Sequence, residues 1–552
     1  MTKSNLSSQA LALHQAGNFR EAETLYRTIL ASNPHDINAL NLLGTVLSQQ
    51  DRHQEGLQWV EAAIALKPDF SDAYNNHGIM LEKLGRYEEA LASCDKAIAL
   101  DPNFVEAYSN RANALQGLKR YDDALASCNQ AIAINPCSPE AHNNRAHALQ
   151  KLERYTEALA SCEQAIALAP RFAQAHSNRS HALEKLEGFE EALASSNQAV
   201  ALAPTNHEFQ NNRAIVLEQL LQYDEALKAY DAAIALYPDY ASAHWNKGLV
   251  QLRLGKYKEG WELYEWRWKR PEHEGDLHIY PQAPWLGKEP VSDQTILLHS
   301  EQGLGDSIQF CRYVPLLAAR GAKVILEVPD SLIALMSTLE GNPQVISRGS
   351  TPPPFNLHCP LMSLPLAFET ICDTIPAHVP YLHANPEKHA KWKEHLGIKT
   401  KPRIGLAWSG IPLHKNDHNR SMSLETLAPL WALDMEFHCL QKEIRAEDMR
   451  VLSECPMTSH TQHLQDFSDT AALAAEMDLI ISVDTSVAHL AGALGKPVWI
   501  MLPFIPDWRW MMHRKDSLWY PTARLFREPK AHDWASVVAD VVKELGRVVH
   551  ER

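Results

Sequence analysis

Hydrophobic and polar positions follow two different patterns along the chain, and the change falls near residue 285. Before that point, apolar and small residues recur at the three- and four-residue spacing of one helix face. After it, short apolar runs such as residues 295–299, 323–328, 479–483 and 498–502 alternate with helical segments. The first pattern predicts an all-helical part, and the second predicts an α/β part with parallel strands.

Prolines mark a repeat in the helical part, because neighbouring members of one set are all 34 residues apart. The set is Pro34, Pro68, Pro102, Pro136, Pro170, Pro204 and Pro238. Within the unit 105–138, two helical segments are separated by a polar turn, and small residues such as Ala124 and Ala131 permit close helix approach. A period of this size predicts a solenoid of helical hairpins, with eight units from about Ser4 to about Glu274.

The period, the alanine positions, the terminal proline and a recurring aromatic residue together resemble the tetratricopeptide repeat. The aromatic positions are Tyr87, Tyr121, Tyr155, Phe189, Tyr223 and Tyr257. The resemblance implies a superhelix, lined on its inner side by the first helix of each unit, whose groove binds an extended chain. We therefore expect residues 1–274 to form the repeat array, with a protein or peptide as its partner.

A set of asparagines also steps by 34 residues along the predicted groove. Its members are Asn76, Asn110, Asn144, Asn178, Asn212 and Asn246. An asparagine amide both donates and accepts, so such a ladder suits a peptide backbone. A similar ladder holds the protein substrate in O-GlcNAc transferases, and the resemblance implies acceptor binding here. Alternatively, these amides bond neighbouring repeats or reflect duplication of one unit, as the near-identical segments 87–99 and 155–167 suggest.

The helical part ends in a stretch that is rich in tryptophan and proline. It contains Trp261, Trp266, Trp268 and Trp285, together with Pro281, Pro284 and Pro290. A flexible tether would be rich in glycine and serine, whereas tryptophans supply large contact areas. We therefore expect residues 275–290 to be a linker across which the last repeat docks rigidly onto the next domain.

The α/β part begins with a strand at 295–299, a glycine-bearing loop, a segment of helical spacing at 307–321 and a strand at 323–328. In such a unit the loop lies at the ligand-binding edge of the sheet. Gly303 and Gly305 let a ligand approach the backbone, and Asp306 begins the helix. A helix-capping role is the default interpretation of that aspartate.

A second α/β half begins at the strand 403–410 and continues through a predicted helix at 424–433 and a strand near 437–442. Residues at the ends of these strands are candidates for donor binding. They are Trp408, Ser409, Gln441 and Lys442. The strand 479–483 then leads into Asp484, Thr485 and Ser486 and a helix that carries His489.

The polar group after residue 483 suggests a nucleotide-sugar site. A carboxylate at a strand end suits a sugar hydroxyl, and free helix N–H groups suit a pyrophosphate. Asp484 would supply the carboxylate, and Thr485 or Ser486 would cap the helix. The alternative is that Asp484 only caps the helix.

Two motifs, ILLHSEQGLGDSIQF and SVDTSVAHLAGALGKPVW, resemble the ADP-heptose:lipopolysaccharide heptosyltransferase family. The resemblance implies a GT-B fold of two Rossmann-like halves, at 291–395 and 396–552, after the α-solenoid. It also implies that Asp306 is the general base and that Asp484 and Thr485 bind donor sugar and phosphate, with His489 nearby. Arg420 is the candidate for donor phosphate, since a guanidinium binds a leaving diphosphate bidentately.

The chain departs from that family at several points. Ser486 stands where the family usually has glycine, Arg420 where lysine is common, and the family has no repeat array. Heptose and lipopolysaccharide are therefore not carried over. The segment Trp508-Arg509-Trp510 follows the strand 498–502, where it could cover the donor or form part of the core.

The composition of the chain argues against some classes of binding partner. A net charge of -15 argues against binding to nucleic acid or to anionic membranes, and no apolar run suits a leader or a membrane span. We expect a soluble cytoplasmic protein. Cys94, Cys128 and Cys162 fall in apolar helical pattern and are expected to be core residues. No metal-ligand spacing and no Asp-x-Asp motif occur, so we expect neither a metal nor a cofactor beyond the nucleotide-sugar co-substrate.

These features predict a glycosyltransferase, inverting by the resemblance, that moves a sugar from a nucleotide donor to a hydroxyl of a protein held by the repeats. Two alternatives remain. One is a non-catalytic adaptor with a degenerate GT-B domain. The other is a polysaccharide or lipid-glycan transferase whose repeats recruit assembly partners.

Overall fold

The computed structural model describes residues 3–271, 280–412 and 416–550. Part of the predicted linker, 275–279, and part of the polar loop after residue 410, 413–415, lie outside the described residues. The chain divides into two compact units, Met1–Pro238 and Asp239–Arg552. The predicted domain boundary at residue 274 stays a prediction.

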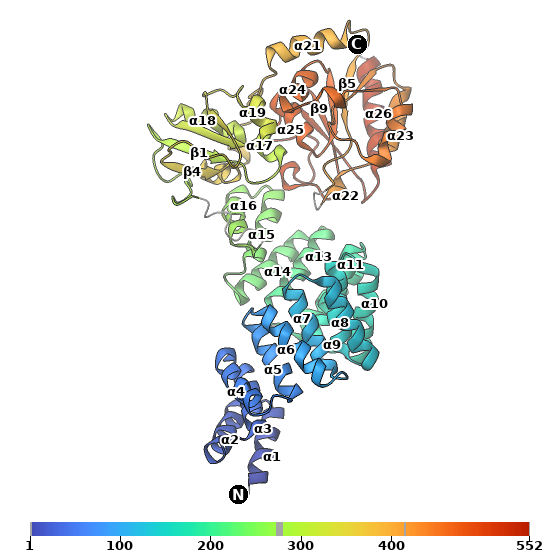
Figure 1. Ribbon diagram of the computed structural model, residues 1–552. Coiled ribbons are helices and arrows are strands. Elements are labelled where there is room, and N and C mark those ends of the chain that lie inside the picture. Colours follow the sequence, from blue (N-terminus) through green and yellow to red (C-terminus); the bar gives the residue numbers. More distant parts are fainter. Residues whose placement is uncertain (1–2, 272–279, 413–415, 551–552) are drawn as a thin grey trace. The chain divides into compact units, whose positions relative to one another are not determined.

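Within its described residues, the first unit is a stack of seven helical hairpins (Figure 1). The helices are α1 (Lys3–Gln15), α2 (Phe19–Ser32), α3 (Ile37–Ser48), α4 (His53–Leu66), α5 (Ser71–Lys83), α6 (Tyr87–Leu100), α7 (Val105–Gly117), α8 (Tyr121–Ile134), α9 (Pro139–Lys151), α10 (Tyr155–Leu168), α11 (Ala173–Lys185), α12 (Phe189–Leu202), α13 (His207–Gln219) and α14 (Tyr223–Leu236). First helices of successive hairpins contact one another, as α5, α7, α9 and α11 do, so they share one face of the stack.

Small residues form the core between the helices of each hairpin. Ala124 and Ala131 are fully buried, which allows the close approach that the repeat pattern predicts. Cys94, Cys128 and Cys162 are also fully buried, and burial raises the pKa of each thiol to about 12. These cysteines are therefore protonated, inert core residues at neutral pH.

The second unit opens with an eighth hairpin, α15 (Ala241–Arg253) and α16 (Tyr257–Tyr264), and the 3-10 helix η1 (Glu265–Lys269). Two parallel sheets follow. The first has the order β3-β2-β1-β4, from β1 (Thr295–His299), β2 (Lys323–Val328), β3 (Gln344–Ser347) and β4 (Leu357–Pro360). The second has the order β10-β9-β8-β5-β6-β7, from β5 (Arg403–Ala407), β6 (Glu436–Cys439), β7 (Met457–Ser459), β8 (Leu479–Val483), β9 (Val498–Leu502) and β10 (Ala523–Arg527).

Helices and short 3-10 turns connect these strands. They include α17 (Leu304–Phe310), η4 (Cys311–Tyr313), α18 (Val314–Ala319), α19 (Asp330–Met336), α20 (Leu364–Ala367), α21 (Pro386–Leu396), α22 (Asp417–Arg420), η7 (Leu424–Ala432), α23 (Met449–Glu454), α24 (Phe467–Ala475), α25 (Ser486–Ala493), η10 (Trp508–Trp510) and α26 (Trp534–His550). A helical solenoid followed by two parallel sheets confirms the predicted fold class.

Proline alters two of the expected helices. The segment 307–321 is not one helix, because a 3-10 turn separates α17 from α18, where Pro315 occupies the first turn. The segment 424–433 is the 3-10 helix η7, with Pro429 inside it. A proline in a helix interior removes one backbone donor and clashes with the preceding turn, so a regular α-helix is not formed.

Each sheet has one point at which the strand order reverses, between β1 and β4 in the first sheet and between β5 and β8 in the second. Ligands of open parallel sheets bind beyond the carboxyl ends of the strands at such points. Asp306 lies in the first turn of α17, directly after the loop that follows β1, and Asp484 lies in the loop after β8. In the described part of the chain, none of the helices has the length and apolar character needed to cross a bilayer.

Candidate functional site

Asp484 directly follows β8, and Thr485 holds the N-cap position of α25. The alternative that Asp484 is itself the helix cap is therefore not supported. Burial, and after it the negative charge of Asp507, raises the pKa of the Asp484 carboxyl to about 6, against the opposing effects of Arg509, Trp510 and Arg420. The group therefore changes charge near neutral pH, as expected for a functional carboxyl.

His489 lies one turn along α25 and faces Asp484. Its Nε2 is 3.8 Å from Asp484 Oδ1, and its Nδ1 is 2.9 Å from the hydroxyl of Tyr520. Burial, followed by the charges of Arg509 and nearby arginines, holds the pKa of His489 well below its ordinary value. The imidazole is therefore neutral, with one ring nitrogen beside the Tyr520 hydroxyl and the other beside Asp484.

Gly305 permits the approach of the two halves at this point. A Cβ atom there would lie 2.7 Å from Cδ2 of His489, closer than side chains tolerate. α17 and α25 are in contact. The glycine of the first motif therefore brings the loop after β1 against the helix that carries His489.

Arg420, the last residue of α22, reaches the same place. Its Nη1 donates to the backbone carbonyl of Asp484 at 3.2 Å, and its Nε lies 3.6 Å from Asp417 Oδ1. Nε is buried and has no hydrogen-bond partner among the described residues. The guanidinium thus stands beside the start of α25 with donor capacity to spare, which suits an anion.

Asp306 makes two contacts within the site. Its Oδ2 accepts the N–H of Gly303 at 2.8 Å, so the capping role is present. Its Oδ1 accepts from Nη2 of Arg509. The same guanidinium donates through Nη1 to Asp507 at 2.8 Å and through Nε to Gln309 at 2.6 Å. Arg509 therefore joins the Asp306 loop of one half to the segment after β9 of the other.

The residues expected at the ends of β5 and β6 mainly bond to each other. Gln441 accepts from the backbone N–H groups of Trp408 and Ser409 at 2.6 and 2.9 Å. The indole of Trp408 is fully buried and donates to Asp448 at 2.7 Å. Lys442 donates to the carbonyl of Gln465 at 2.6 Å. These four residues lie at the expected edge, but the Trp408 side chain belongs to the core.

The asparagine set forms bonds between repeats. The amides of Asn76, Asn110 and Asn178 donate to Asn41, Asn75 and Asn143 at 3.0, 2.8 and 2.9 Å. Asn144 and Asn212 donate to Ser109 and Ser177 at 3.4 and 3.2 Å. Asn246 lies at the equivalent position of α15 in the second unit. The alternative of bonds to the neighbouring repeat is therefore realised, and acceptor binding stays a prediction.

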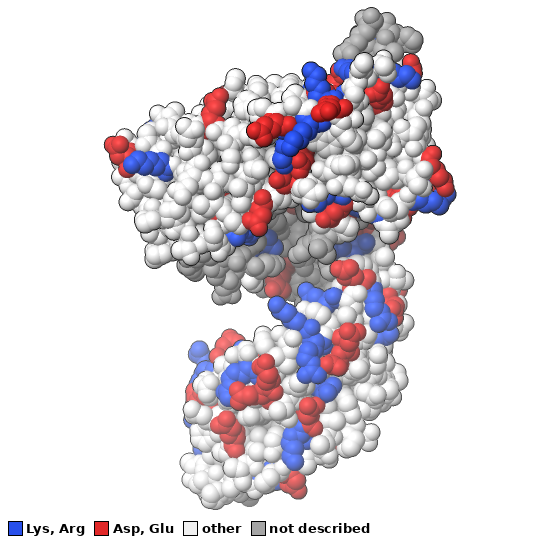
Figure 2. Space-filling view, turned by 45° about the horizontal axis from the view of Figure 1, so that its top comes forward, with Lys and Arg blue, Asp and Glu red and all other residues white. Residues whose placement is uncertain are grey.

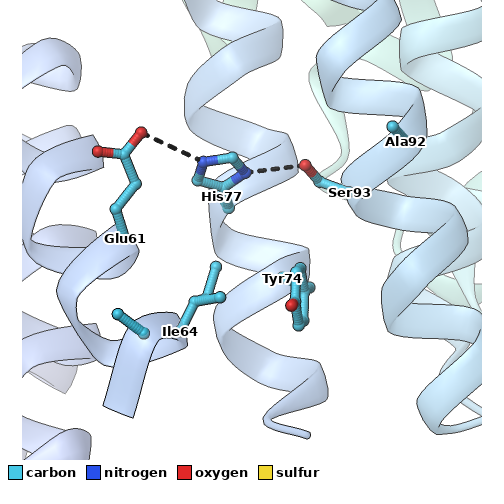
Figure 3. A pocket seen from close by; sticks show the side chains of 7 residues that line it. Glu61, Ile64, Tyr74, His77, Ala92 and Ser93 are labelled. Carbon is cyan, nitrogen blue, oxygen red and sulfur yellow. Dashed lines mark hydrogen bonds and ion pairs between the residues drawn. The ribbon is translucent and has the colours of Figure 1, made fainter. Parts of the chain in front are cut away.

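A cavity of about 410 Å³ lies among α4, α5 and α6 of the first unit (Figure 3). His77 Nδ1 is 2.8 Å from Ser93 Oγ, and its Nε2 is 3.7 Å from Glu61. Ser93, His77 and Glu61 form a row of the residue types found in hydrolase catalytic triads. Ser93, however, lies inside α6, where backbone N–H groups are engaged in the helix and cannot form an oxyanion hole. The row is therefore structural.

Arg509, Asp507 and Tyr520 complete the site, and sequence reasoning did not assign them these roles. Arg509 had been identified only as a possible cover or core residue. Its place after β9, at the carboxyl edge of a parallel sheet, was the available signal. Across the described ranges, no group of three or more His, Cys, Asp or Glu side chains could hold a metal ion. Acidic and basic side chains are intermixed on the face drawn in Figure 2.

Comparison with known families agrees with the two parts of the chain. Models described as tetratricopeptide repeat match residues 8–71, 71–104, 105–136 and 139–172, and one described as TPR repeat matches 222–255. The model of glycosyltransferase family 9 (heptosyltransferase) matches residues 463–500, which include β8, Asp484 and α25. The chain thus contains tetratricopeptide repeats, and residues 463–500 of its α/β part are similar to glycosyltransferase family 9.

Among curated proteins, the chain is similar to Protein FlbA of Caulobacter vibrioides, with 22% identity over 311 residues. The match spans 52% of this chain and 52% of that protein, so the chain covers about half of the relative's length. Among solved structures, it is similar to a tetratricopeptide repeat protein from Parabacteroides merdae (17% identity, TM-score 0.38, 45% of this chain and 98% of that one). It is also similar to YrrB, a TPR protein with an unusual peptide-binding site (24% identity, TM-score 0.28, 34% and 98%).

Proposed function

We propose that this protein is a glycosyltransferase that uses a nucleotide-sugar donor bound at the second switch point. The observation that carries the proposal is the convergence of Asp484, the start of α25 and the Arg420 guanidinium between β5 and β8. The helix N-terminus and the guanidinium suit a diphosphate, and the carboxyl suits a sugar hydroxyl. The match of residues 463–500 to glycosyltransferase family 9 supports the same location.

In the proposed reaction, an acceptor hydroxyl oxygen forms a bond to the anomeric carbon, and the bond from that carbon to the diphosphate oxygen breaks. The hydroxyl proton passes to the carboxylate of Asp306. Each oxygen of that carboxylate accepts one hydrogen bond and so keeps lone pairs for the acceptor. Arg420 and the N–H groups of α25 stabilise the charge that develops on the diphosphate.

The acceptor in our first proposal is a protein hydroxyl, presented by a chain that the repeats hold. The Asn side-chain oxygens, more than their amide nitrogens, would then contact it. A second candidate is a glycan acceptor, with the repeats recruiting a partner protein. This candidate is favoured by the hydrogen bonds through which the Asn amides join neighbouring repeats instead of pointing donors at a ligand.

The reaction is tested by incubating the full chain with UDP-, GDP-, ADP- and CMP-linked sugars and measuring release of the free nucleotide. We expect release from one donor, and a loss of about 100-fold or more in Asp306→Asn when an acceptor is present. Equal turnover of Asp306→Asn and wild type would remove the base role of Asp306. Release from none of the donors would contradict the transferase proposal.

The ladder is tested separately by replacing Asn110, Asn144 and Asn212 with Ala. If the repeats hold a protein acceptor through these side chains, the KM for that acceptor rises while donor hydrolysis is unchanged. If they only join repeats, the variant unfolds at a lower temperature and the KM stays the same.

A further inference from the structure

A second cavity, of about 280 Å³, lies at the carboxyl edge of the first sheet and contains several polar side chains. His299 and Ser300 come from the end of β1, Glu327 from β2, and Arg348 from the turn after β3. Its volume is close to the lower end of the roughly 300–1,000 Å³ that small-molecule pockets span. It therefore suits a ligand about the size of a single ring.

The tautomers of two histidines follow from their contacts. His358 Nε2 is 2.8 Å from the carbonyl oxygen of Gln282, which only accepts, so Nε2 carries a proton. Burial lowers the pKa of His358 and brings that of His299 to about 3, so both rings are neutral. His358 Nδ1 must then accept from His299 Nε2 at 3.3 Å. His299 Nδ1 is consequently an unprotonated acceptor with no partner in the described part of the chain.

Three further groups have unused hydrogen-bonding capacity. Ser300 Oγ is buried and bonds to none of the described residues. Glu327 accepts one bond on each oxygen, from the Gly349 N–H at 2.8 Å and the Tyr280 hydroxyl at 3.1 Å. The exposed Arg348 side chain has no ion pair or hydrogen bond with any described residue. A buried polar atom without a partner costs about 1–3 kcal/mol, so a ligand that satisfies it gains affinity.

The charges select the chemical class. Glu327 repels an anion, and Arg348 repels a cation. A neutral polyol satisfies both, because each of its hydroxyls can donate to a carboxylate or His299 Nδ1 and accept from a guanidinium. We propose that this cavity binds one uncharged sugar residue of the acceptor. This inference rests on the proposed function and favours its second candidate, the glycan acceptor, over the protein acceptor.

The place of the cavity supports that assignment. Ser300 begins the loop between β1 and α17, Asp306 lies in the first turn of α17, and both lie beyond the carboxyl edge of one sheet. That loop is fixed between them, because Glu301 is bound by Arg267 at 2.8 and 2.9 Å. A sugar held against Ser300 is therefore positioned relative to the proposed base by a short, anchored segment.

The test is saturation-transfer NMR of the full chain with glucose, galactose, mannose and N-acetylglucosamine at millimolar concentration, without nucleotide. We expect transfer to at least one sugar, reduced at least fivefold in Glu327→Gln and Ser300→Ala. The exposed Glu340→Gln serves as the matched control and should retain the signal. Tyr280→Phe removes only a hydroxyl and should weaken the signal while the thermal unfolding midpoint is unchanged.

Absence of transfer to all four sugars, or equal transfer in Glu327→Gln and Ser300→Ala, would overturn the inference. Free serine is added as a second ligand in the same experiment. Saturation transfer to serine, and not to a sugar, would overturn the inference as well. Nucleotide binding is measured on the same samples by calorimetry. Sugar binding without nucleotide binding would retain the cavity and reject the transferase, whereas the reverse result would reject the cavity alone.

Discussion

At the scale of single residues, Asp484 links the chemistry of the site to the stability of the fold. Its pKa of about 6 lies above the ordinary value of 3.8, so the folded chain holds this proton more tightly than the unfolded chain. The corresponding contribution to stability is complete below the ordinary pKa and is lost as the pH rises through 6. At neutral pH the buried carboxylate therefore destabilises the protein.

Asp484→Asn tests this sign. At pH 8 we expect the free energy of unfolding of the variant to exceed that of wild type by about 2–3 kcal/mol, because one pKa unit corresponds to about 1.4 kcal/mol. At pH 4 we expect almost no difference. Urea unfolding between pH 4 and 8 measures the difference. Asp540→Asn, on the exposed face of α26, should show no such trend. A gain in Asp484→Asn that does not change with pH would contradict the account.

Some non-glycine residues in the turns of the helical hairpins adopt a left-handed backbone conformation. Lys119 and Glu153 are exposed and adopt positive φ angles of 59°, which side chains other than glycine resist. We expect Lys119→Gly and Glu153→Gly to raise stability by about 0.5–1 kcal/mol each. A left-handed conformation costs a side chain roughly 1–2 kcal/mol, and the larger backbone entropy that glycine loses on folding offsets part of that gain. Gln130→Gly, in the interior of α8, should lower it by a similar amount. Thermal unfolding separates the two, and destabilisation by both turn variants would contradict the interpretation.

Single-residue predictions from sequence were limited by distance along the chain. The role of Asp306 as a helix cap follows from its local motif, but its contact with Arg509 joins residues 203 positions apart. No local pattern encodes such a pair. The asparagine period was evident, yet both interpretations of it have the same spacing. Only the donor–acceptor distances in the structure show that the amides join adjacent repeats.

At the scale of elements, α16 and η1 anchor the loop that leads into α17, the helix of Asp306. Arg267 is 2% exposed and binds Glu301 bidentately, with further bonds to Glu265 and Ser363. The hydroxyl of Tyr264 accepts from Gln302 at 2.9 Å. The eighth hairpin therefore supports the first switch point directly and acts as part of the α/β unit.

Arg267→Gln should destabilise the second unit by about 3–5 kcal/mol, because it leaves the carboxylate of Glu301 buried without its cation. The exposed pair of Arg154 and Glu157 provides the comparison, and Arg154→Gln should cost less than about 1 kcal/mol. Denaturant unfolding of both variants measures the contrast. Equal costs would show that burial of the Arg267 pair has no special role.

Element types were well predicted where the pattern was strongly periodic. The strands 295–299, 323–328, 479–483 and 498–502 match β1, β2, β8 and β9 residue for residue. The two helices that differ from expectation both contain proline. Apolar spacing alone does not distinguish an α-helix from a 3-10 helix, since in each the same side chains reach the core.

At the scale of the whole molecule, the compact units divide after Pro238. The docking of the last repeat explains this division. Trp261 is buried and donates to the Thr370 carbonyl at 3.1 Å, and Trp519 donates to the Tyr257 hydroxyl at the same distance. The tryptophans are evident in the sequence. The elements that they join could not be predicted, because each of these hydrogen bonds links residues more than 100 positions apart.

Two truncated chains test this division. We expect residues 239–552 to be expressed as a cooperatively folded protein, whereas 275–552 should aggregate, because removal of α16 exposes its aromatic partners Trp508 and Trp519. Size-exclusion chromatography and thermal unfolding give the readout. Equal behaviour of the two chains would place the boundary at residue 274 after all.

The central claim is a nucleotide-binding site at the second switch point, and calorimetric titration of the full chain with UDP, GDP, ADP and CMP tests it most directly. We predict that one nucleotide binds with a Kd in the micromolar range and that Arg420→Ala weakens it at least tenfold, since about 1.5–3 kcal/mol is typical of a hydrogen bond to a charged group. Lys399→Ala, at an exposed position away from the switch point, should bind as wild type does. Absence of binding by all four nucleotides, or binding that Arg420→Ala leaves unchanged, would contradict the account.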